Sequence, residues 1–180
     1  YFENAGNGAY QIWMRNLADI ASGKKTPPAS VPEECAGLSS DSWVDYQENW
    51  FWTHYFGDGM ALVDDPQASN GKAIQMPGDI IYKIVNLPCF NIAYLFSKPV
   101  HCYIRVRCEN KANTGLAYTI GVSDTVKKEV SLEEAGDNAY HTIDLGLVDI
   151  TPDKIIWALP CGDTSKVKAI YIDRVFFVRK

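Results

Sequence analysis

From about residue 48 onward, the sequence is a series of short apolar runs of β-forming residues, each followed by turn residues. The breaks contain Gly, Asn, Asp or Pro, and the runs recur at roughly 8 to 12 residues, which is typical of a β-sandwich or barrel. No helical period follows residue 45, so the pattern argues against alternating strands and helices. We predict an all-β module over residues 46–180. The predicted strands are residues 49–56, 60–63, 72–76, 79–85, 91–96, 100–108, 116–123, 129–132, 140–148, 154–160 and 168–178.

The region before residue 46 has a different pattern. Trp13, Leu17 and Ile20 recur at helical spacing and Gly23 follows, which predicts one helix over residues 10–22. Three prolines then make the next stretch an extended connector. Residues 1–45 are therefore expected to be an N-terminal helix and a Pro-rich connector, either the tail of an upstream domain or a strap packed on the sandwich.

Charge and hydropathy exclude two classes of partner. The formal net charge is -5, whereas nucleic-acid binding depends on clustered Lys and Arg, so nucleic acid is not an expected partner. No apolar stretch reaches the roughly 18 residues of a membrane span. Because the chain opens at Tyr1, we expect a mature product or a piece cut from a longer protein. An export signal would be missing in both cases, which leaves room for a protein that is secreted, periplasmic or on the cell surface.

The five cysteines are an odd number, so at least one is unpaired. Cys102 and Cys108 share one face of a predicted strand, too far apart to bridge each other. We expect free thiols that act as small core hydrophobes, and no cysteine or histidine spacing indicates zinc.

The predicted strand at residues 100–108 carries the clearest candidate site. Alternation places Cys102, Ile104, Val106 and Cys108 on the core face and the remaining side chains on the other. The second face is aromatic and cationic, with Tyr103, Arg105 and Arg107. Sugars stack on aromatic rings and uronates offer a carboxylate to arginine, so this face could bind a glycan, including an acidic one. The alternative is a solvated face whose arginines pair with neighbouring acids.

Tryptophans supply further candidate stacking surfaces. Trp50 and Trp52 lie in a run of aromatic residues at 49–56, and Trp157 lies in the predicted strand at 154–160. Most of these rings are expected in the core, because burial of an aromatic side chain is strongly favourable. Any ring left exposed would be a platform for a sugar.

Two segments resemble the galactose-binding-like jelly rolls that accompany bacterial glycoside hydrolases. Residues 63–73, Val-Asp-Asp-Pro-Gln-Ala-Ser-Asn-Gly-Lys-Ala, are similar to their early loop, and residues 169–178 are similar to their closing "Y-I-D-x-V" strand. The early loop departs from the usual pattern at Asn70, where glycine is common; asparagine also tolerates left-handed backbone. More narrowly, residues 105–107, 115–121 and 140–146 look like an uncharacterised accessory family found beside glucuronidase-like domains.

The resemblance implies a jelly-roll β-sandwich and a place in a larger exported polysaccharide-processing protein. It also implies one structural calcium, held by the closing-strand Asp173 with Asp65 and Asn70 of the early loop. Calcium requires six to eight oxygen ligands. The alternative is that Asp173 pairs with an arginine or caps a loop by hydrogen bonds.

We therefore expect a non-catalytic carbohydrate-binding accessory module, with a polysaccharide or oligosaccharide and an intramolecular catalytic domain as partners. A structural sandwich that packs on a catalytic domain without binding sugar is the first alternative. A small glycan hydrolase or lyase is the second, although no catalytic motif appears.

Overall fold

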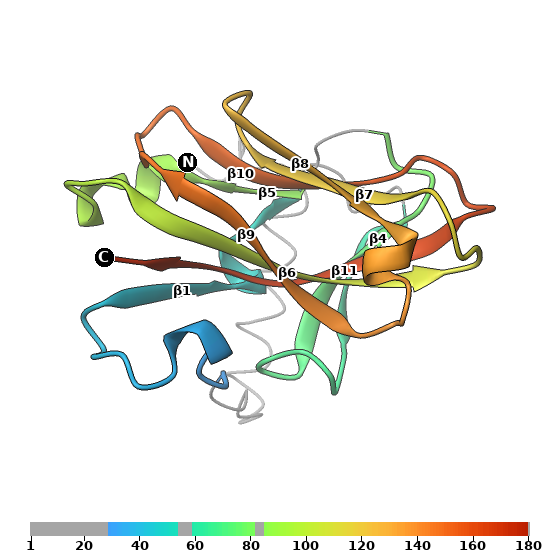
Figure 1. Cartoon of the computed structure of the whole chain (residues 1–180), viewed down its shortest axis with the longest axis horizontal. Coiled ribbons are helices and arrows are strands. Elements are labelled where there is room, and N and C mark those ends of the chain that lie inside the picture. The colour runs from blue at the N-terminus through green and yellow to red at the C-terminus, as the bar shows by residue number, and fades with distance from the viewer. Residues whose placement is uncertain (1–28, 54–58, 82–84, 180) are drawn as a thin grey trace.

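Two antiparallel sheets stacked face to face form the protein in the computed structural model, which describes residues 29–53, 59–81 and 85–179 (Figure 1). Within these residues, the first sheet runs β3-β4-β11-β6-β9, with β1 also paired to β11, and the second runs β2-β5-β10-β7-β8. The strands of the first sheet are β1 (Trp43–Gln47), β3 (Ala61–Asp64), β4 (Lys72–Pro77), β6 (Val100–Asn110), β9 (Tyr140–Val148) and β11 (Val167–Val178). Those of the second are β2 (Trp52–Thr53), β5 (Val85–Pro88), β7 (Leu116–Val122), β8 (Val126–Ser131) and β10 (Ile155–Pro160). The predicted all-β sandwich is confirmed.

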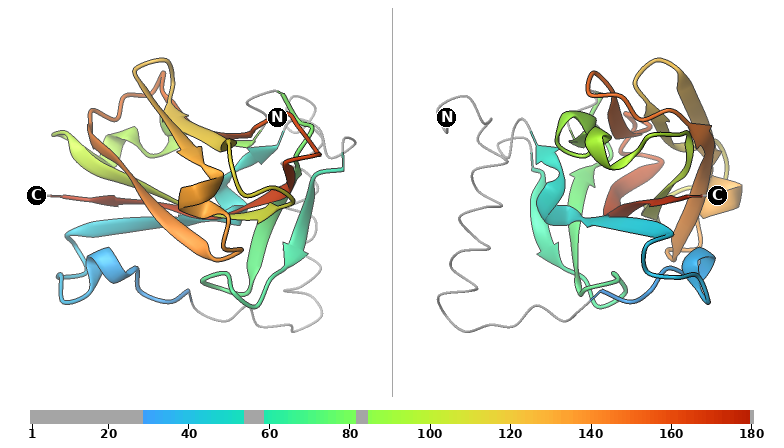
Figure 2. Two further views of the ribbon diagram at one scale, coloured as in Figure 1. Left: turned by 45° about the vertical axis from the view of Figure 1, so that its right-hand side comes forward. Right: turned by 90° about the vertical axis from the view of Figure 1, so that its left-hand side faces the viewer.

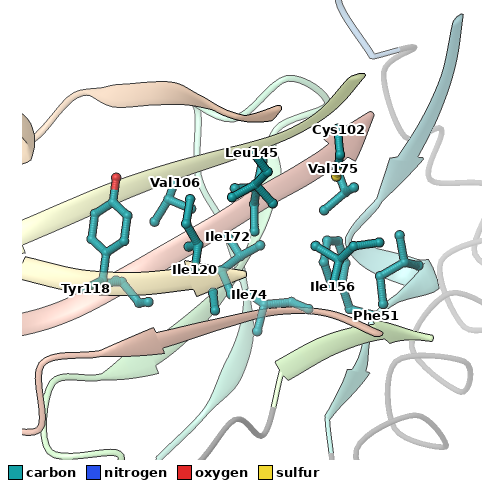
Figure 3. Packing of buried hydrophobic residues seen from close by; sticks show 14 of the residues in the cluster. Phe51, Ile74, Cys102, Val106, Tyr118, Ile120, Leu145, Ile156, Ile172 and Val175 are labelled. Atoms are coloured by element: carbon teal, nitrogen blue, oxygen red, sulfur yellow. The ribbon is translucent and has the colours of Figure 1, made fainter. Parts of the chain in front are cut away.

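The core lies between the two sheets, where the apolar faces of alternating strands meet. Figure 3 shows Val106 and Ile172 of the first sheet beside Ile120 of the second. All three side chains are fully buried. The predicted alternation of β6 is confirmed, because Cys102, Ile104, Val106 and Cys108 all have an exposed fraction of 0%.

Strand β11 is the centre of the first sheet and has two successive neighbours along one edge. Its first half pairs with β4 over Ala169–Ile172, and its second half pairs with β1 over Arg174–Val178. The other edge pairs with β6 along almost the whole strand, with a register shift between Ile172 and Arg174. Asp173 lies at this register shift. The β-bulge leaves Asp173 out of the hydrogen-bond ladder at the point where the neighbouring strand changes from β4 to β1.

The described segment before β1 packs on the outer side of the first sheet. It contains a short 3-10 helix, η1 (Glu33–Cys35), and Cys35 is buried against Phe176 and Val178. Figures 1 and 2 show this blue segment beside β1. The predicted domain boundary between residues 45 and 46 falls inside β1. Residues 29–42 pack on the sandwich and are called the strap, and residues 43–45 are the first part of β1. The helix predicted over residues 10–22 lies outside the described residues.

Several predicted strands differ in the structure. The predicted strand at 49–56 begins in the 3-10 helix η2 (Glu48–Trp50), and the one at 79–85 begins in a turn, with strand structure at β5 from Val85. Residues 91–96, predicted as a strand, belong mainly to the 3-10 helices η3 (Cys89–Asn91) and η4 (Ala93–Leu95), which have i to i+3 hydrogen bonds such as Leu95 N to Ile92 O. The chain crosses here from β5 in one sheet to β6 in the other, so it cannot remain extended. Residues 132–135, partly assigned to a strand, form the one-turn helix α2 (Leu132–Ala135), capped by Ser131.

All five cysteines are free thiols, and four of them are buried. This confirms their predicted role as small core hydrophobes. Among the described residues, no helix has the length and hydropathy that crossing a membrane requires.

Candidate functional site

The outer face of β6 is occupied by two arginine–aspartate pairs rather than open to solvent. Arg107 donates from Nε and Nη2 to Asp65 Oδ2 at 3.2 and 2.6 Å, and Tyr140 donates its hydroxyl to the same oxygen at 2.9 Å. Arg107 also lies over the Tyr171 ring, 3.7 Å from its centroid. Arg107, predicted as a ligand-binding residue, is therefore buried and used inside the protein.

The second pair fixes the bulge of β11. Arg105 donates from Nη1 to Asp173 Oδ2. Ser69 donates both its backbone N–H and its hydroxyl to Asp173 Oδ1, at 3.0 and 2.8 Å. Asp173 is fully buried, whereas the Arg105 side chain keeps 23% of its surface exposed. Together, the two pairs hold loop 65–71 against the face of β6.

This arrangement determines the charge state of Asp65. Burial raises the pKa of its carboxyl, but hydrogen bonds from Arg107, from the Gln67 N–H and from Tyr140 outweigh burial and bring the pKa below its ordinary value. Asp65 is thus an ionised partner of Arg107.

The residues predicted to hold calcium do not fit the ion in this arrangement. Oxygens of Asp65 and Asp173 already accept hydrogen bonds, and each carboxylate faces a guanidinium group whose charge would repel a cation. Asn70 donates from Nδ2 to Glu48 Oε2 at 2.8 Å, and its Oδ1 accepts the Lys72 N–H. Across the described residues, no group of three or more His, Cys, Asp or Glu could hold a metal. The alternative arginine partner for Asp173 is the arrangement found.

The turn of the same loop differs in one detail from the expectation for Asn70. The left-handed residue is Gly71, with φ of +82°, while Asn70 is not among the described non-glycine residues with positive φ. The Asn70 side chain instead joins the turn to Glu48.

Tyr103 lies in a row of rings on the same sheet face. Its ring stacks on Phe176 at 4.8 Å between centroids and 10° between planes, and His101 follows at 6.1 Å. Tyr103 also packs against the cluster that contains Cys35, so the strap covers part of this face. Tyr103 is consequently half-buried rather than an open platform.

Trp157, a predicted stacking residue, lies in the interior of the second sheet. Its ring is only 2% exposed, and its indole N–H donates to the Ser123 carbonyl at 2.8 Å. β10 lies between β5 and β7, in the middle of the second sheet, so the side chain is covered. A ring in this position cannot stack on a sugar.

Trp50 is the predicted tryptophan that the structure leaves exposed, at 47%. It ends the 3-10 helix η2 (Glu48–Trp50), and its ring meets the buried ring of Tyr46 edge-on, with centroids 5.3 Å apart and planes at 80°. We call Trp50 with Tyr46 beneath it the Trp50 platform. The side chain of Trp52 is outside the described residues.

Sequence reasoning missed Tyr94, which is 81% exposed on η4. Burial raises the pKa of Tyr46 to about 12. Tyr94 lies two residues before Phe96, whose ring contacts Phe177 at 5.0 Å between centroids, and Phe177 in turn contacts Tyr46 at 5.9 Å. The residue was assigned to a strand and so to a half-buried position. Recognising the crossover between the sheets would have been the necessary signal.

No family model matches the sequence, and no curated protein does. Solved structures with a similar arrangement include an exo-beta-1,3-galactanase from Phanerochaete chrysosporium, at 16% identity and a TM-score of 0.44, over 82% of this chain and 32% of that one. An uncharacterized protein from Listeria monocytogenes has 11% identity and a TM-score of 0.42, over 67% and 11%. The C-terminal family 22 carbohydrate binding module of Clostridium thermocellum Xyn10B has 9% identity and a TM-score of 0.47, over 79% and 89%. The chain spans about a third or less of the first two structures.

Proposed function

We propose that the chain is a non-catalytic carbohydrate-binding module of a larger exported protein that processes polysaccharide. The observation that carries this proposal is the Trp50 platform: an indole that is 47% exposed yet held edge-on by a buried ring. A ring fixed in this way loses little conformational freedom when a sugar stacks on it. The apolar C–H face of a pyranose is a suitable partner for such a ring.

Tyr94 offers a second exposed ring. Among the large hydrophobic residues that the structure describes it is the most exposed, and it lies on the crossover that precedes β6. A second exposed ring lets a polymer make two stacking contacts, and its hydroxyl can hydrogen-bond to sugar hydroxyls. These features favour the Trp50 end over the predicted face of β6, where Arg105 and Arg107 are engaged with Asp173 and Asp65.

The carboxylates support a non-catalytic role. Glycoside hydrolysis requires two accessible carboxyl groups, one with a raised pKa. Burial raises the pKa of Glu48, but that side chain is enclosed and hydrogen-bonded to Asn70. Asp65 is ionised against Arg107, and Asp173 is enclosed between Arg105 and Ser69. Burial also raises the pKa of Asp45, whose carboxyl accepts a hydrogen bond from Gln47 and faces Arg174. None of these four groups combines access to a substrate with proton donation.

A module of this kind acts by proximity. One or two stacked sugars give modest affinity, but a tether raises the effective concentration of the linked catalytic domain on the polymer. The catalytic domain and the export route belong to this proposal.

Affinity electrophoresis of the full chain against neutral and acidic polysaccharides tests the proposal. We expect at least one polymer to retard the protein, and Trp50→Ala to weaken that interaction by roughly tenfold or more, about the 1.4 kcal/mol lost with a stacking contact. Leu147→Ala is the matched control, because Leu147 is similarly exposed but lies on β9.

Three outcomes are informative. Retardation lost in Trp50→Ala and kept in Leu147→Ala supports the site. Retardation kept in Trp50→Ala but lost in Tyr103→Leu would return the site to the face of β6. A protein that no polymer retards would contradict carbohydrate binding.

The last outcome would favour the structural alternative, which has its own supporting observation. The exposed Trp50 and Tyr94 rings could equally pack on a neighbouring domain of the same polypeptide. In that case the two rings would become protected when the neighbouring domain is present. Chemical labelling of tryptophan, compared between the present chain and a longer protein that includes the neighbouring domain, would detect this protection at Trp50.

A further inference from the structure

A pocket of about 140 Å³ lies where the chain enters β6, beside the last described residues of β11. Its wall is formed by the segment 95–100 and by Arg179. Phe96 supplies an aromatic side, and Ser97 and Lys98 supply polar groups. We call this hollow the Lys98–Arg179 pocket. Its volume suits a carboxylate group and part of a sugar ring.

The pocket carries two positive charges, on Arg179 and Lys98, and the Asp41 carboxyl is an acidic group that Arg179 acts on. Arg179 donates to the Asp41 carbonyl from Nη1 and to the Leu95 carbonyl from Nη2, the latter at 3.3 Å. These two carbonyl acceptors orient the guanidinium, and the Asp41 carboxyl, whose pKa Arg179 helps to lower, forms no ion pair with it. Among the residues that the structure describes, neither Arg179 nor Lys98 forms an ion pair, in contrast to Arg105 and Arg107.

The orientation of Arg179 is fixed from a third side. Its guanidinium carbon lies 5.8 Å from the centroid of the Phe96 ring. Its backbone N–H donates to the Ser42 carbonyl at 2.7 Å, which ties this end of the chain to the segment before β1. A guanidinium held in this way still has N–H groups to offer, and its planar fork matches a carboxylate.

A chain of ring contacts connects the pocket to the Trp50 platform through the interior, because Tyr46 and Phe177 are buried. Trp50 contacts Tyr46 at 5.3 Å, Tyr46 contacts Phe177 at 5.9 Å, and Phe177 contacts Phe96 at 5.0 Å between ring centroids. Tyr94 precedes the pocket residue Leu95 in sequence and is exposed. The Trp50 platform and the cationic pocket are therefore linked by three successive ring contacts.

We infer that the Lys98–Arg179 pocket binds the carboxylate of a uronic acid residue in the glycan that stacks on the Trp50 platform. This inference rests on the proposed function and names its ligand class, an acidic polysaccharide. Arg179 provides a charge-assisted hydrogen-bond pair, Lys98 adds a mobile ammonium, and the Ser97 hydroxyl can reach a sugar hydroxyl.

The test uses one polymer in two states of charge, polygalacturonic acid and its methyl ester, with the full chain. We expect the acid to bind at least tenfold more tightly than the ester at low salt, and this preference to shrink as salt screens the charges. Lys98→Gln and Arg179→Gln should each reduce affinity for the acid at least threefold and leave affinity for the ester unchanged. Lys128→Gln, an exposed lysine on β8, is the charge-matched control.

The possible results separate the inference from the proposed function. Equal binding of acid and ester, or a preference that both pocket variants retain, would overturn the pocket while Trp50-dependent binding stands. Loss of all binding in Trp50→Ala, together with loss of the acid preference alone in Lys98→Gln, supports both. A sulfated glycan that competes better than polygalacturonic acid would overturn the assignment to a carboxylate. If neither polymer binds, the inference is wrong.

Arg179 also holds the residues after β11 against the segment before β1, so Arg179→Gln could unfold the protein. In that case Lys98→Gln is the variant that decides.

Discussion

Arg107 directs two nitrogen atoms at a single carboxylate oxygen of Asp65, and the Tyr140 hydroxyl donates to that same oxygen. These side chains come from β6, from loop 65–71 and from β9, so one carboxylate joins three separated parts of the chain. Removing either charge would leave the other buried without a partner, which is far more costly than losing an exposed pair.

Asp65→Ala and Arg107→Met are each expected to lower the free energy of unfolding by about 2–4 kcal/mol. Urea unfolding followed by tryptophan fluorescence measures this. The double variant should lose less than the sum of the two, because the second change removes an already unpaired charge. Lys127→Ala breaks an exposed pair with Glu129 and should change stability by less than about 0.5 kcal/mol. A loss as small as this in Asp65→Ala would contradict the proposed importance of the pair.

Calcium is expected to leave the thermal stability unchanged. Guanidinium groups occupy the positions around Asp65 and Asp173 where the ion was predicted, so millimolar calcium or a chelator should move the midpoint of thermal unfolding by less than about 1 °C. Scanning fluorimetry in both conditions is sufficient. An increase of several degrees with calcium, absent with magnesium, would show that the ion displaces an arginine.

Glu48→Gln is expected to stabilise the protein at neutral pH. Burial raises the pKa of Glu48 in the folded state, so its ionisation costs stability as pH rises from the unfolded pKa through the folded pKa. The glutamine keeps an oxygen for Asn70 and removes this cost. The midpoint of thermal unfolding should rise by about 2–4 °C at pH 7, and the advantage should disappear below about pH 4. Glu33→Gln, at an exposed position, should behave like the parent protein at both pH values. A stabilisation that does not depend on pH would contradict the electrostatic explanation.

A thiol reagent should distinguish one cysteine from the other four. Cys161 is partly exposed, while Cys35, Cys89, Cys102 and Cys108 are at most 1% exposed. Burial also raises the pKa of Cys35 to about 11 and that of Cys89 and Cys108 to about 12, which suppresses the reactive thiolate. We expect one thiol to react quickly in the native protein and five in denaturant. Cys161→Ser should remove the fast phase, and a fast phase that persists would show that a second thiol is accessible.

The sequence was sufficient to predict the sandwich and the inward face of β6, because alternation in a strand depends only on neighbouring residues. It also raised arginine as the alternative partner of Asp173. It could not show that Arg107 meets Asp65, since this contact joins residues 42 positions apart through the pairing of strands. The missing information was which strands lie side by side in the folded protein.

Trp157 and Tyr94 illustrate the same limit for the candidate site. Both are aromatic residues in apolar runs, yet one is 2% exposed and the other 81%. The difference is that Trp157 belongs to a strand with a neighbour on each side, while Tyr94 belongs to a crossover between sheets. The local sequence pattern is similar around Trp157 and Tyr94, and the position of each segment in the fold determines how exposed the ring is.

The position of β11 has a consequence for how the domain is made. The strand pairs with β1, β4 and β6, but it is the last strand of the described chain to leave the ribosome. Until it emerges, the earlier strands of the first sheet have no central neighbour, and their apolar faces remain open to solvent. Contacts between residues as distant in sequence as Trp43 and Val178 also make folding slow. The entropy of closing a long loop is lost before the contacts that stabilise the closed loop can form. The first sheet is therefore assembled only after β11 has emerged, and a chaperone has its longest opportunity to act on the earlier strands before that stage.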